Sequence, residues 1–157
     1  MDSSHADVRA RATVILSHFL DRLDSSTLAK TGLAEVLWAA VAPNLAALPP
    51  VTDLDDSVHL LKVTYPALIS LAKLWHPSPR DRLPLWDKLV RDGVIYSMMY
   101  SGEKIKIAEV TLDALDLMIE EMRIHFVKHL KVLSLFSSLI SVRYPSDILC
   151  ASESGWK

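Results

Sequence analysis

The spacing of apolar residues in the second half of the chain constrains the fold most. Between residues 104 and 122 they follow one another at intervals of three or four: Ile105, Ala108, Leu112, Leu115, Ile119 and Met122. This is the period of one face of an α-helix, so we expect these side chains in the core. Acidic residues recur on the same helix at intervals of four and three: Glu109, Asp113, Asp116 and Glu120. They predict a charged stripe that faces water or a basic partner.

The rest of the chain shows the same helical period. Only four glycines occur among its 157 residues, and no segment alternates polar and apolar residues as a strand would. We therefore expect helices near residues 6–23, 28–47, 53–74, 81–100, 104–122 and 124–140. Short connections between these helices predict antiparallel neighbours.

Capping residues and prolines predict where the helices begin, end and bend. We expect Thr52 to cap the third helix and Ser78 the fourth, and Gly102 to end the fourth in a left-handed conformation. Pro43 and Pro66 fall inside apolar-periodic segments, where each proline removes one backbone hydrogen bond. Two helices are therefore expected to be kinked.

Sandwiched amphipathic helices in consecutive antiparallel pairs predict an all-α fold, a HEAT-like α-solenoid of about six helices. No clean internal repeat is visible, so a compact irregular bundle stays open as an alternative. We expect residues 1–140 to form a single helical-repeat domain, and residues 141–157 to form a C-terminal tail that is a truncated repeat.

Composition narrows the function. Half of the residues are hydrophobic and the mean hydropathy is +0.23, which predicts apolar surface that a partner covers. The net charge of −2 offers no basic field for nucleic acid. The longest apolar stretch, Val36–Pro43, is far shorter than the roughly 20 residues that cross a bilayer. The N-terminus lacks the pattern of a signal peptide and the lone Cys150 suits a reducing compartment, so we expect a cytoplasmic or nuclear protein.

Two histidines four residues apart, His125 and His129, have the spacing with which metalloproteases hold zinc. Those enzymes need a glutamate directly after the first histidine, and Phe126 stands there instead. In helical projection His129 falls on an apolar arc, while Lys128 and Lys131 lie on the opposite side. We therefore predict a packed or interface histidine, and neither metal nor cofactor. A small metal-binding bundle or metal-dependent enzyme that uses the two histidines remains the alternative.

No catalytic motif occurs elsewhere, which predicts a protein that is not an enzyme. "YSMMY", residues 96–100, could form a methionine-rich binding surface or an aromatic cofactor slot. On a helix its side chains point in several directions, so ordinary packing is the favoured interpretation. A bundle that homodimerises through its apolar excess is a further alternative.

Four segments occur in the order found in one protein family: "GLAEVLWAAVAPNLAALPPVT" (32–52), "LLKVTYPALISLAKL" (60–74), "LVRDGVIYSMMY" (89–100) and "EMRIHFVKHLKVL" (121–133). The matching residues are Trp38, Pro43, Tyr65, Pro66, Arg91, Gly93, His129 and Lys131. Over about residues 28 to 145 the chain resembles the second Tel-two-interacting protein family. Members of that family are longer, so the last repeat is expected to be cut off, which leaves apolar surface exposed.

The resemblance implies a HEAT-type α-solenoid without an active site. It implies a scaffold or adaptor subunit of the triple-T co-chaperone complex, which matures and stabilises phosphoinositide-kinase-related protein kinases. The partners implied are the other subunits, including a large helical-repeat protein, and indirectly the kinase clients and chaperone machinery. His129 would then be structural. As residues of the partner interface we expect Arg91, Lys128 and Lys131.

Overall fold

The computed structural model describes residues 3–131 and residue 134. The elements in this part of the chain are α1 (Ser3–Leu20), α2 (Ser25–Thr31), α3 (Leu33–Val41), the 3₁₀-helix η1 (Ala42–Ala46), α4 (Leu54–Trp75), α5 (Pro79–Leu89), the π-helix η2 (Val90–Ile95), α6 (Tyr96–Ser101), α7 (Ile105–Met122) and the 3₁₀-helix η3 (Arg123–Phe126). Residues 127–131 are helical again. The described part of the chain is helical without a strand, which confirms the all-α prediction. The expected helix 124–140 is described only up to residue 131 and at residue 134. The expected tail 141–157, with Cys150, lies outside the described residues.

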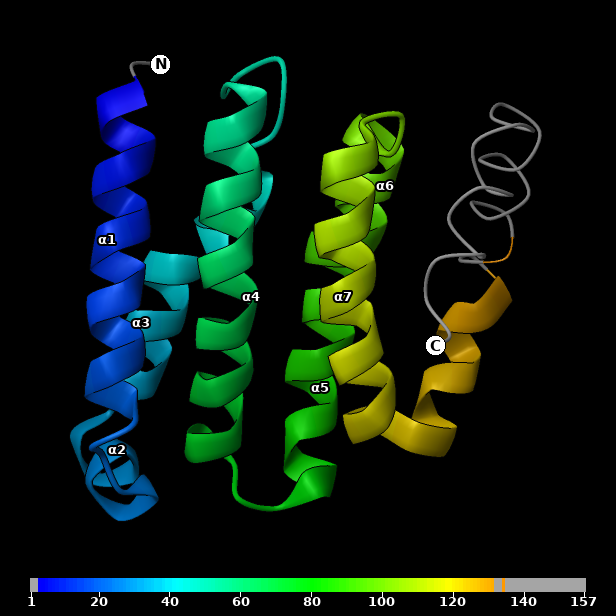
Figure 1. Ribbon diagram of the computed structural model, residues 1–157. Helices are drawn as coiled ribbons and strands as arrows, with labels where there is room; N and C mark the ends of the chain where they lie inside the picture. The colour runs from blue at the N-terminus through cyan, green and yellow to red at the C-terminus, as the bar shows by residue number, and fades with distance from the viewer. Residues whose placement is uncertain (1–2, 132–133, 135–157) are drawn as a thin grey trace, which may run out of the picture.

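The helices form two layers (Figure 1). In one layer α1, α4 and α7 stand side by side and run in the same direction. In the other layer α3 and the continuous helix of residues 79–101 run in the opposite direction. The central α4 contacts α1, α3 and α7, so it carries the packing between both layers.

One apolar core cluster runs through both layers. Leu61, Leu68 and Leu71 of α4 are fully buried in it, together with Trp86 of α5 and Met118 of α7. Full burial of such side chains stabilises the fold by about 1.5–3 kcal/mol each. The core therefore rests on α4, which supplies side chains to neighbours on three sides.

The prediction of the core face of α7 is wrong in part. Leu115 and Met122 are buried, but Ile105, Leu112 and Ile119 are 57%, 50% and 39% exposed. The buried face is instead formed mainly by residues that lie one or two sequence positions from the expected ones: Ile107, Val110, Thr111, Ala114 and Met118. Both faces are apolar in sequence, and the packing of α4 and η2 against α7 selects the second face. The acidic stripe of α7 is exposed, as predicted.

The expected second helix, residues 28–47, is three separate elements. Gly32 has φ +66°, a left-handed conformation that ends α2 and begins α3. Pro43 stands at the start of η1, so α3 ends at Val41 where a kink within one helix was expected. α4, by contrast, continues through Pro66 over its full length.

Helix caps follow the expected places but not always the expected residues. Asp53, and not Thr52, caps α4, because its carboxylate accepts a hydrogen bond from the backbone N–H of Asp55. Ser78 occupies the N-cap position of α5, although its hydroxyl makes no capping hydrogen bond. Gly102 ends α6 with φ −63°, so the left-handed conformation expected there is wrong.

Candidate partner interface

An apolar groove lies on the layer formed by α3 and by residues 79–101. Its volume is about 560 Å³, within the range of ligand-binding clefts in proteins. Residues of α3 and η1 form one side, and residues of α5, η2 and α6 form the other. Charged side chains gather along the η2 side.

The side of the groove formed by α3 and η1 is made of one large and several small residues. Trp38 lines the groove while it is almost completely buried, so its indole ring forms part of the floor. The ring of Trp75 lies against it with centroids 6.4 Å apart. Pro43 starts the tighter 3₁₀ turn after α3, and the small side chains of Ala42 and Ala46 leave the space above the floor open.

The opposite side depends on the π-helix η2. Gly93 of η2 approaches α4 so closely that a Cβ atom there would lie 3.1 Å from the ring of Tyr65. The "RDG" sequence is therefore part of a widened helical turn inside the segment 81–100, which was expected to form one helix. Isolated π-helical turns occur frequently at functional sites.

The segment "YSMMY" contributes to both the core and the groove. Met98 is buried, whereas Met99 and Tyr100 line the groove and are 65% and 63% exposed. Tyr96 and Tyr100 lie one turn apart with ring centroids at 4.4 Å. The prediction of ordinary packing therefore holds for only part of the segment. The signal that sequence reasoning passed over is the four-residue spacing of the two tyrosines, which puts both rings on one face of a helix.

Arg91, expected at the interface, lines the groove together with Lys88 and Asp92. Its Nε donates a hydrogen bond to Asp92 Oδ1 at 3.0 Å, and both side chains are largely exposed. Lys88 makes no ion pair with any residue that the structure describes. The rim of the groove therefore presents two cations and one carboxylate, which is already paired.

Lys128 and His129 converge on Asp87 of α5. Lys128 Nζ donates to Asp87 Oδ2, and His129 Nε2 lies 2.9 Å from Asp87 Oδ1. Burial acts to raise the pKa of Asp87, but the hydrogen bonds and charges of the two partners outweigh it, so the net pKa lies below its usual value. Lys128 thus joins two helices of this chain, and Lys131 is exposed without an ion pair to the described residues.

His129 is packed, as predicted. Its side chain is only 14% exposed, and its ring lies 5.8 Å from that of Phe126. His125 is exposed and belongs to η3. Within residues 3–131 no three His, Cys, Asp or Glu side chains gather in a way that could hold a metal ion. The metal-site alternative therefore has no third ligand in this region.

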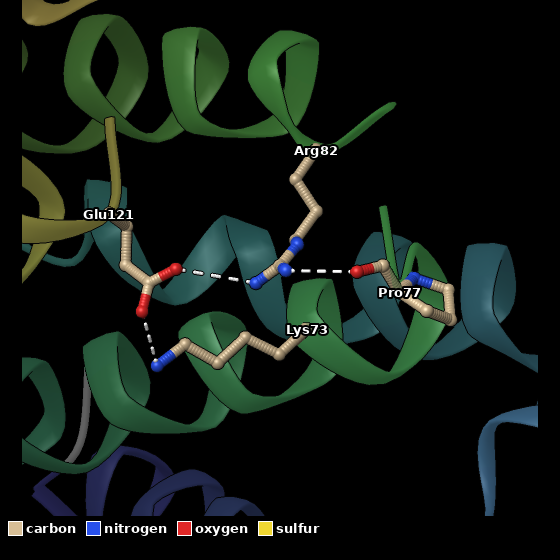
Figure 2. Close-up of polar contacts among 4 residues, drawn as sticks. All are labelled: Lys73, Pro77, Arg82 and Glu121. Atoms are coloured by element: carbon tan, nitrogen blue, oxygen red, sulfur yellow. Dashed lines mark hydrogen bonds and ion pairs between the residues drawn. The ribbon is translucent and has the colours of Figure 1, made fainter. Parts of the chain in front are cut away.

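A polar cluster joins the end of α4, the start of α5 and the end of α7 (Figure 2). Glu121 lies between two cations, with Oε1 2.8 Å from Lys73 Nζ and Oε2 3.3 Å from Arg82 Nη1. Arg82 also donates to the backbone oxygen of Pro77 at 3.0 Å. Because Arg82 is only 13% exposed, this cluster fixes the relative position of three helices rather than offering a free site.

The fold and the groove define an all-helical, two-layered protein with an apolar surface hollow. None of the described helices is long and apolar enough to span a bilayer. A model of the Tti2 family matches residues 1–142, and the chain therefore belongs to the Tti2 family. This confirms the resemblance to the second Tel-two-interacting protein family. No curated protein and no solved structure matches the chain.

Proposed function

We propose that the chain is a non-catalytic helical-repeat scaffold or adaptor subunit of the triple-T co-chaperone complex, which matures and stabilises phosphoinositide-kinase-related kinases. Membership of the Tti2 family supports this proposal. The parallel succession of α1, α4 and α7, with a helix that returns in the second layer after α1 and after α4, is consistent with a HEAT-type solenoid. Residues 1–140 would be one such domain, located in the cytoplasm or the nucleus.

The observation that carries the proposal beyond family membership is the exposed apolar groove. A water-exposed wall of Met99 and Tyr100 above the ring of Trp38 is costly for a protein that acts alone, because apolar area left in water forfeits about 25 cal/mol per Å². A partner that covers this area recovers that free energy. Polar residues at the edge of such an interface fix its register.

Among the expected interface residues, Arg91 and Lys131 provide the cleanest tests. Both are exposed, and among the residues that the structure describes Arg91 bonds only to its neighbour Asp92. Reversal of Lys128, in contrast, also removes a contact with Asp87 that joins two helices. A loss of partner binding by a Lys128 variant would therefore combine a surface effect with a structural one.

Co-expression with the other two triple-T subunits tests the proposed function. We expect the tagged chain to recover both subunits in constant ratio through size-exclusion chromatography. Arg91→Glu and Lys131→Glu should reduce this recovery, and Lys62→Glu, a reversal at an exposed lysine of α4 in the other layer, is the control. Failure to recover either subunit with the unchanged chain would refute the proposal.

A further inference from the structure

We infer that the groove between η1 and α6 binds an acidic, amphipathic segment of a partner protein. A large apolar side chain of the segment would enter the groove above Trp38, and a carboxylate of the segment would pair with Lys88 and Arg91. This inference rests on the proposed partner-binding function and names the site and the chemistry of the segment it takes.

The shape of the groove favours a protruding side chain of a peptide. One wall is low because Ala42 and Ala46 carry only methyl groups, and the other wall is high because Met99 and Tyr100 project from α6. The thioether chain of Met99 is unbranched and adapts its shape to different apolar groups. An open groove with such walls suits the apolar face of an amphipathic helix, which presents anchors three or four residues apart.

The charges at the rim favour a carboxylate on that segment. Asp92, the acidic residue that lines the groove, accepts the hydrogen bond of Arg91 Nε. The terminal guanidinium nitrogens of Arg91 and the ammonium group of Lys88 have no acceptor among the residues that the structure describes. Guanidinium binds carboxylate with two parallel hydrogen bonds, so an acidic residue beside the apolar anchor would satisfy donors that otherwise bind water.

The neighbouring acidic residue of the same helix does not cancel this preference. Asp87 lies one turn before Arg91, but its two carboxylate oxygens are taken by Lys128 and His129. The local charge near the η2 side of the groove is therefore positive, although the whole chain carries a net charge of −2. A basic segment would meet two cations there and bind poorly.

The inference is tested with overlapping synthetic peptides that cover the other two triple-T subunits, each labelled with fluorescein and titrated with the full chain. We expect the peptides that bind to share a large apolar residue next to Asp or Glu. The double variant Lys88→Glu/Arg91→Glu should weaken their binding by roughly tenfold, a loss of about 1.4 kcal/mol. Replacement of the acidic residue of the peptide by Lys should restore binding to this variant, since the charges are then exchanged.

Two further variants separate the groove from other effects. Met99→Ser removes part of the exposed wall without touching the core, and we expect it to weaken the same peptides. Lys62→Glu changes the net charge as much as either groove substitution does, but Lys62 lies on α4, away from the groove. We expect this variant to bind the peptides with unchanged affinity. Circular dichroism of each variant confirms that the fold is retained.

The inference is overturned if no peptide binds, if the binding peptides lack acidic residues, or if their affinities are the same for the groove variants and the unchanged chain. These results would leave the proposed function standing when the chain still recovers both intact subunits. Failure of that recovery is a separate outcome, measured in a separate experiment.

Discussion

Gly93 lies where the helix of residues 79–101 passes close to Tyr65 of α4, and Gly93→Ala tests whether this approach shapes the fold. A Cβ atom at this position would lie 3.1 Å from both Cε1 and Oη of Tyr65, and 3.4 Å from Cδ1 of Leu45. Carbon atoms in favourable contact are about 3.5–4.0 Å apart. Tyr65 is only 1% exposed, so its ring has little room to move away.

Two opposing effects decide the sign of the change in stability. An added methyl group in a well-packed core costs about 1–3 kcal/mol. Replacing glycine by alanine within a helix gains about 0.5–1 kcal/mol, because the unfolded chain loses conformational freedom. The overpacking is the larger effect at Gly93, since the contact is with a buried ring. We therefore expect Gly93→Ala to lower the free energy of unfolding by about 1 kcal/mol.

Urea denaturation followed by circular dichroism measures this change as a lower midpoint with an unchanged slope. The same substitution in a Tyr65→Phe background is the control, because removal of Oη deletes one of the two contacts at 3.1 Å. The cost of Gly93→Ala should be smaller in that background. A stabilising effect of Gly93→Ala, or an equal cost in both backgrounds, would refute the reasoning.

Three further predictions concern ionisable side chains that are buried or bonded. Burial raises the pKa of Tyr65 to about 12, and the nearby hydroxyls of Ser97 and Thr111 only partly oppose this. The neutral phenol is thus favoured in the folded state, and its contribution of about 2–3 kcal/mol to stability is complete below pH 10 and is lost as the pH rises towards 12. Tyr65→Phe should therefore flatten the decline of the denaturation midpoint above pH 10. Parallel declines of the variant and the unchanged chain would contradict this assignment. The lowered pKa of Asp87 has the opposite effect on the pH dependence, because the stabilisation by its carboxylate is present above about pH 4 and disappears as the pH falls further. Asp87→Asn should therefore destabilise the protein by about 1 kcal/mol at pH 7 and by less in acid. Thermal unfolding measured at a series of acidic pH values tests this. Glu121→Gln removes the charge next to Arg82 and should cost about 1–2 kcal/mol in urea denaturation, whereas an unchanged midpoint would show that the cluster in Figure 2 contributes nothing to stability.

The sequence predicted the helical segments well and the orientation of one helix poorly. In α7 the apolar residues cover more than half of the helical circumference, so periodicity alone offers two candidate core faces. The choice between them depends on where α4 and η2 lie, which is a property of the packed structure. Leu115 and Met122 are buried whichever of the two faces points to the core. Leu112 is expected in the core only because it continues the three- and four-residue spacing.

The groove itself was not predicted from the sequence. Arg91 lines it and stays a predicted interface residue. Trp38 and Met99 are separated by some sixty positions in the chain, and no local pattern indicates that they face one hollow. Likewise, Asp87 was not expected as the partner of Lys128, because a contact between distant helices has no signature in spacing.

The sequence by itself determined that this chain is helical, where its helices run approximately, and to which family it belongs. These properties depend on neighbours within one or two helical turns and on the order of residues along the chain. Only the tertiary structure decided which face of α7 is buried, that η2 widens into a π-helix beside Tyr65, and that α3 and α6 enclose a groove. Such features arise when helices far apart in sequence compete for the same space, and close packing allows one arrangement of their side chains.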